Sequence, residues 1–122
     1  MQYVTYLIDL FDLKINDEKV SVLEDAYKCN LSPMVKRIIS NCDEPIFLDE
    51  DRVMSYNEIK YASEDLEFDF NKINCMPIID CGSNYYILYN FKDKKWCSFC
   101  LADETVFNQF NTLKELMDKR YL

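Results

Sequence analysis

The N-terminal third of the chain repeats apolar residues at helical spacing, and its three stretches predict helices over 1–11, 17–28 and 33–42. Asn16 or Asp17 is a suitable cap for the second helix. Ser32 is expected to accept hydrogen bonds from the first turn of the third helix, where Pro33 loses no helical bond.

Two further helices are predicted from capping boxes, in which a Ser or Thr is followed three residues later by Glu. Residues 55–58 predict a short helix after Met54, and residues 112–115 predict a helix at the C-terminus. Leu113, Leu116 and Met117 form the apolar stripe of this terminal helix.

Extended runs fill the middle of the chain. An apolar run over 45–48 and a second over 76–79 predict strands, and the only glycine, Gly82, marks the turn after the second. Residues 85–91 and 96–101 then predict an antiparallel hairpin, joined by the charged connection 92–95. Alternation places Tyr85 and Ile87 on a core face and leaves the opposite face half covered.

Residues 63–70 alternate acidic and apolar side chains, which predicts either a loop or an edge strand. In an extended conformation the carboxylates of Glu64, Asp65, Glu67 and Asp69 form an acidic row. Such a row is suited to a basic partner, and it equally protects a sheet edge against unwanted pairing.

Asp49, Glu50 and Asp51 form a run of adjacent carboxylates. The run lacks the alternating oxygen ligands, central glycine and terminal glutamate of an EF-hand, so we expect a solvated turn rather than a calcium site.

Composition indicates one globular domain over 1–122, with 49% hydrophobic and 15% aromatic residues. The formal net charge of −8 disfavours binding to nucleic acids and to anionic membranes, and it favours a basic partner. The N-terminal stretch resembles neither a signal peptide nor a membrane span, which predicts a cytoplasmic protein with reduced thiols.

Four cysteines in the central region raise the question of a metal site. Cys97 and Cys100 have the C-x-x-C spacing of zinc ligands, but residues three apart in a strand face opposite sides of the sheet. Cys75 and Cys81 flank an apolar strand, and the chain contains no histidine. We therefore favour structural cysteines, with a zinc protein as the alternative that metal analysis would detect.

The residue types also argue against an enzyme. The absence of histidine removes the usual general base, and one glycine is too few for a phosphate-binding loop. Carboxylates are plentiful, but no pair is singled out by its spacing. A binding module that needs no cofactor is the remaining interpretation.

Four stretches together resemble the SUKH superfamily, which includes bacterial immunity proteins and yeast cell-wall-assembly regulators. They are VLEDAYKCNLSPMVKRII, VMSYNEIKYA, MPIIDCGSNYYILYNF and FNTLKELM, and they extend over about four fifths of the chain. The chain departs from the family pattern at residues 41–44, where an Asn-Gly turn is usual, and at Gly82, which alone represents a glycine-rich turn.

The resemblance implies an α+β domain with a mainly antiparallel sheet and a central hairpin, flanked by N-terminal helices and a C-terminal helix. It implies a non-enzymatic protein that neutralises a cognate polymorphic toxin, often a nuclease, inside the producing cell. An acidic protein is suited to the basic cleft of a nuclease.

The partner-binding residues predicted on this basis are Asp49, Glu50, Asp51, Glu64, Asp65, Glu67, Asp69, Tyr86 and Trp96. The aromatic pair is included as exposed anchors, although Trp96 equally fits a core position. The alternative function is a housekeeping regulatory or scaffold domain that binds an endogenous protein or a small ligand beside the hairpin.

Overall fold

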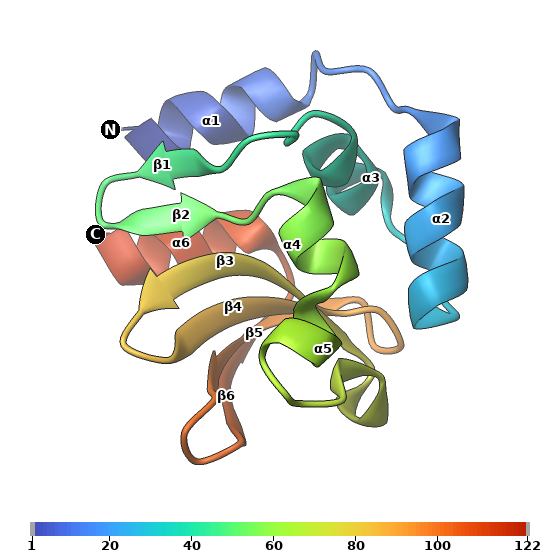
Figure 1. Cartoon of the computed structure of the whole chain (residues 1–122). Coiled ribbons are helices and arrows are strands. Elements are labelled where there is room, and N and C mark those ends of the chain that lie inside the picture. The colour runs from blue at the N-terminus through green and yellow to red at the C-terminus, as the bar shows by residue number, and fades with distance from the viewer. Residues whose placement is uncertain (1, 122) are drawn as a thin grey trace.

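The fold is α+β, as predicted, and a computed structural model describes it over residues 2–121 (Figure 1). One antiparallel sheet contains six strands in the order β1-β2-β3-β4-β5-β6. In chain order the elements are α1 (Gln2–Leu10), α2 (Asp17–Tyr27), α3 (Pro33–Ser40), β1 (Ile46–Leu48), β2 (Asp51–Val53), α4 (Tyr56–Lys60), α5 (Ala62–Asp65), η1 (Phe70–Ile73), β3 (Cys75–Gly82), β4 (Tyr85–Asn90), β5 (Lys95–Cys100), β6 (Thr105–Phe110) and α6 (Leu113–Tyr121).

The three predicted N-terminal helices are present. The Asn16 side chain caps α2 by accepting from the Lys19 amide, as expected. Ser32 precedes α3 in an extended conformation but makes no side-chain capping bond, so that part of the prediction was wrong. Pro33 occupies the first turn of the helix, as expected. None of the helices in residues 2–121 combines the length and apolar character needed to cross a membrane.

Both predicted capping boxes begin helices. In α4 the box is complete, because Ser55 Oγ accepts from the Glu58 amide and the Glu58 carboxylate accepts from the Ser55 amide. In α6 the Thr112 hydroxyl accepts from the Glu115 amide at 3.1 Å.

The segment over 63–70 is not an edge strand. Glu64 and Asp65 belong to α5, and Asp69 caps the 3-10 helix η1 by accepting from the Asn71 amide at 3.1 Å. Phe68 and Phe70 are buried and pack on Phe99 of β5, with ring centroids 5.1 and 5.7 Å apart. Glu67 before these two aromatic residues and Asp69 between them are exposed. A half-buried strand has the same alternation of apolar and polar residues, which is why the sequence did not distinguish the two.

The central hairpin of β4 and β5 forms as predicted. In the turn between β3 and β4, two residues besides Gly82 have a left-handed backbone. Gly82 has a φ of 80°, and Ser83 and Asn84 between β3 and β4 also have positive φ angles of 52° and 69°. Two positive φ angles match the twist of antiparallel strands at a two-residue turn. Pro77 lies at a register shift against β4, a position where a missing amide is tolerated.

Strand β6 was not predicted. It is the edge strand next to β5, and all of its residues except half-buried Phe110 are exposed. The left-handed Asn108, with φ 52°, lies at a register shift in this pairing. An uncharged, exposed strand interrupted by a bulge has neither the alternation nor the burial by which strands are recognised in a sequence.

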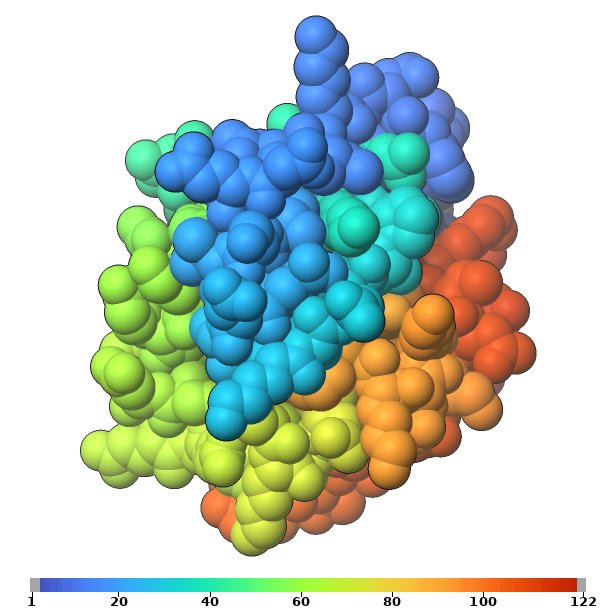
Figure 2. Space-filling model, turned by 90° about the vertical axis from the view of Figure 1, so that its right-hand side faces the viewer, coloured from blue at the N-terminus to red at the C-terminus, as the bar shows by residue number. Residues whose placement is uncertain are grey.

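Helices cover both faces of the central strands, which corrects the prediction of a half-covered face. Figure 1 shows α4 and α5 in front of the sheet and α6 behind it. Ile87, Leu88 and Tyr89 are successive residues of β4, and each is at most 1% exposed. Figure 2 shows α2 spread over one side of the molecule with the β4–β5 turn nearby, where Tyr27 and Phe91 have ring centroids 6.2 Å apart.

Replacing Phe99 by Ala is expected to lower the free energy of unfolding by about 3–5 kcal/mol, because it removes a fully buried ring that contacts two others. Phe107→Ala on the neighbouring strand is the matched control and should cost less than about 1 kcal/mol, since Phe107 is 36% exposed. Urea unfolding of the two variants measures both values; equal losses would contradict the assignment of Phe99 to the core.

Candidate functional site

The turn between β1 and β2 presents only part of the predicted acidic run. Asp49 and Glu50 are exposed, and Asp49 has a left-handed φ of 56°. Asp51 is 1% exposed, so its prediction as a partner-binding residue was wrong. Burial of a carboxylate requires a partner of opposite charge, and α6 supplies one.

Arg120 of α6 holds the Asp51 carboxylate in a bidentate ion pair. Its Nε donates to Oδ2 at 2.6 Å and its Nη2 donates to Oδ1 at 2.8 Å. The pair joins β2 to a helix 69 residues later in the chain. The ion pair fixes the turn between β1 and β2, so the exposed carboxylates of Asp49 and Glu50 lie on an anchored segment.

The second predicted acidic stretch remains at the surface. Glu64, Asp65, Glu67 and Asp69 are all exposed, and we call these four residues the α5 acidic patch. Glu64 and Asp65 belong to α5, Glu67 lies in the turn after it, and Asp69 caps η1. The four carboxylates are therefore exposed on a helix, a turn and a cap, not on the extended strand considered for them.

The two aromatic anchors predicted for an interface lie in the interior. Tyr86 is 8% exposed and Trp96 is 4% exposed. Trp96 packs on Tyr89 with ring centroids 5.2 Å apart, as expected from its alternative assignment to the core. The prediction of both residues as exposed anchors was wrong, because helices cover both faces of the hairpin.

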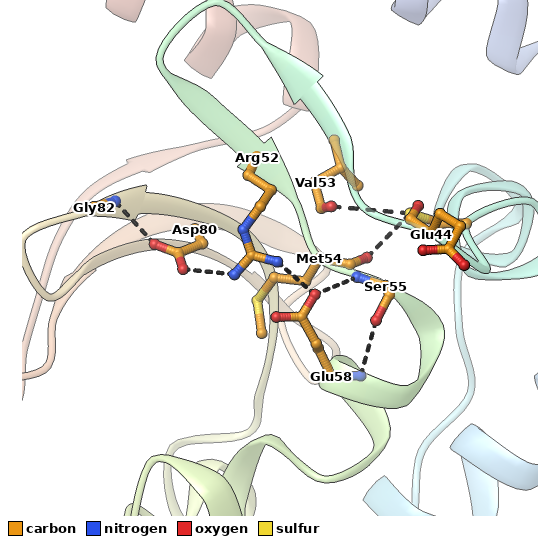
Figure 3. A network of polar contacts seen from close by, with 9 residues as sticks. Glu44, Arg52, Val53, Met54, Ser55, Glu58, Asp80 and Gly82 are labelled. Atoms are coloured by element: carbon orange, nitrogen blue, oxygen red, sulfur yellow. Dashed lines mark hydrogen bonds and ion pairs between the residues drawn. The ribbon is translucent and has the colours of Figure 1, made fainter.

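A half-buried polar network lies beside the hairpin (Figure 3). Arg52 of β2 donates to Glu58 of α4 at 2.5 Å and to Asp80 of β3 at 2.8 Å. Partial burial opposes ionisation of Glu58, but hydrogen bonds from Arg52 and from the Ser55 amide outweigh it and lower the pKa of the Glu58 carboxyl. An ionised, paired Glu58 is suited to hold α4 on the sheet, not to act as a general acid.

The four central cysteines do not converge on one point. Cys97 and Cys100 lie three residues apart in β5 and so face opposite sides of the sheet. Cys75 and Cys97 are neighbours, and their hydrogen bond together with burial raises the pKa of Cys75. Burial, with Asp51 nearby, raises the pKa of Cys81 to about 12. Over residues 2–121 no three cysteines or carboxylates are arranged to hold a metal ion.

A groove of about 600 Å³ lies between α6 and the β3–β6 part of the sheet. Tyr85 and Phe107 form an aromatic wall, with ring centroids 6.2 Å apart and planes at 89°. Lys119 and Arg120 contribute the charged side chains of the lining. A small-ligand site beside the hairpin was considered above, but one wall of this groove is strand β6, which was not predicted.

Comparisons with protein-family models, with curated proteins and with solved structures give no match for this chain.

Replacing Arg120 by Leu is expected to lower the free energy of unfolding by about 3–5 kcal/mol, because it leaves the buried Asp51 carboxylate without its ion pair. The double variant Asp51→Leu with Arg120→Leu should recover much of this loss, since no buried charge remains. Lys119→Leu, an exposed neighbour on α6, should change stability by less than about 0.5 kcal/mol. Chemical denaturation tests all three, and a double variant no more stable than Arg120→Leu would argue against the buried charge.

Glu58→Gln is expected to reduce stability at neutral pH and to reduce its loss in acid. The lowered pKa means that ionised Glu58 stabilises the fold fully above its unfolded-state pKa of about 4.3, and that this contribution is lost as pH falls through the folded-state value. Unfolding at pH 7 and pH 3 should therefore show a larger difference between wild type and variant at pH 7. Glu64→Gln, exposed on α5, is the control and should have little effect at either pH; a Glu58 effect independent of pH would refute the ion-pair explanation.

Proposed function

We propose that this chain is a non-enzymatic protein-binding module and, specifically, an immunity protein that neutralises a cognate nuclease-type polymorphic toxin. The observation that carries the proposal is the α5 acidic patch, in which four carboxylates within six residues remain exposed on a folded surface. A chain with a net charge of −8 and such a patch is complementary to a basic protein cleft.

The proposed interface consists of the α5 acidic patch together with Asp49 and Glu50. Asp51, Tyr86 and Trp96 are omitted because they are buried. Rim charges of this kind mainly accelerate association and set partner choice, so the interface also needs an apolar centre.

The resemblance to the SUKH superfamily is the second support for the proposal, and the immunity role comes from it. The stretch MPIIDCGSNYYILYNF corresponds to β3, the turn at Gly82 and β4, and FNTLKELM leads into α6. These are the elements that the resemblance implied for those stretches, in an α+β fold of the implied class.

A housekeeping regulatory or scaffold domain is the second candidate. The groove between α6 and β6 favours it, because its size is in the range of small-ligand sites and its lining combines aromatic and cationic side chains. The two candidates predict different genetic settings: a gene for a large secreted toxin beside the immunity gene, or an isolated locus.

Co-expression with the toxin domain encoded next to this gene is expected to protect cells. Reversing the α5 acidic patch to lysine should abolish protection, because the partner's basic surface then meets like charges. The control reverses four other exposed acids, Asp93, Asp103, Glu104 and Glu115, which changes the net charge equally and should leave protection intact.

Two outcomes would count against the proposal. If cells that express the toxin domain die although they also express the wild-type chain, the immunity function is rejected. If the variant with the reversed α5 acidic patch still protects cells, the acidic interface is rejected. Circular dichroism of each variant establishes that the fold is retained.

A further inference from the structure

The outward side of α1 carries large apolar residues. Val4, Ile8 and Phe11 follow one another at intervals of four and three residues, so they line one side of the helix and the turn that ends it. They are 40%, 61% and 66% exposed, whereas Tyr3 and Leu7 on the inward side are buried. A helix that is apolar on both sides is normally covered on both.

The other long helices do not share this property. The exposed side of α2 carries Asp17 and Asp25, and the exposed side of α6 carries Lys114 and Glu115. Branched and aromatic residues are also poorer helix formers than Lys or Glu at solvent-facing positions. Neither folding nor solubility therefore accounts for the apolar outer face of α1.

This face is held in place at both ends of the helix. The Tyr3 hydroxyl donates to Asp118 of α6 at 3.3 Å. After the helix, the side-chain amide of Asn41 donates to the Lys14 carbonyl at 2.8 Å. The backbone amide of Asn16 donates to Ser40 Oγ, also at 2.8 Å. An anchored apolar surface loses little conformational entropy on binding, which favours affinity.

The charged residues around this apolar face indicate which kind of partner would bind it. Asp9, Asp12, Asp17 and Glu18 are exposed along and after the helix, and Lys14 is the single basic residue in 2–18. A second copy of the chain would bring the same acidic rim and its own net charge of −8 against this one. A partner with basic side chains around an apolar recess is complementary in both respects.

We propose that Val4, Ile8 and Phe11 form the apolar centre of a protein interface whose partner presents a hydrophobic groove rimmed by Lys and Arg. This inference rests on the proposed protein-binding function and adds to it the docking surface and the chemistry of the partner. Apolar anchors enclosed by polar rim contacts are the usual arrangement of binding hot spots.

The test uses a fluorescently labelled amphipathic helical peptide composed only of Leu and Lys, which carries the proposed partner chemistry. The wild-type chain should bind it with an affinity that falls as salt is added. Ile8→Ser and Phe11→Ser should each weaken binding about tenfold or more. Tyr61→Ser, at a site 44% exposed beside α4, is the matched control and should bind within about twofold of wild type. Asp9→Asn with Asp12→Asn should reduce the salt dependence.

Peptide binding unchanged in Ile8→Ser and Phe11→Ser would overturn the proposal. So would sedimentation of the wild-type chain as a dimer that Phe11→Ser dissociates, because the face would then be covered by a second copy. Failure to protect cells from the toxin, with peptide binding still dependent on Phe11, would reject the toxin partner and leave the docking surface standing. Protection and peptide binding that are both insensitive to Phe11→Ser would reject the surface alone.

Discussion

Burial of the central strands on both faces is the constraint on which the rest of this structure depends. Three consecutive residues of β4, Ile87 to Tyr89, have almost no contact with solvent, which requires helices in front of the sheet and behind it. Four aromatic residues of the hairpin therefore belong to the core, namely Tyr86, Tyr89, Trp96 and Phe99. A protein partner would contact helix surfaces, turns and the sheet edges.

Two polar contacts keep helices on the sheet at its β2 side. The Asp51–Arg120 pair fixes α6 to β2, and Arg52 links α4 to β3 through Glu58 and Asp80. The carboxylates of Asp51, Glu58 and Asp80 help to organise the fold through these contacts. The exposed carboxylates at the β1–β2 turn and in the α5 acidic patch contribute to the negative field of the surface.

Local signals in the sequence predicted the elements that depend on interactions between residues close together in the chain. The capping box at 55–58 and the turn at Gly82 lie where expected, because the hydrogen bonds and dihedral angles involved are set within a few residues. The burial of Asp51 was missed because it depends on Arg120 of α6, far away in the chain. Strand β6 was missed because it forms by pairing with β5 and has no buried face of its own.

We propose that this chain binds another protein through its acidic and apolar outer surfaces and not through the sheet. Amide hydrogen exchange of the chain, alone and with the proposed toxin partner, distinguishes these surfaces. We predict slower exchange on binding around α1, the β1–β2 turn and α5, with β3 to β5 unchanged. The absence of a complex, or protection confined to the groove between α6 and β6, would contradict the account.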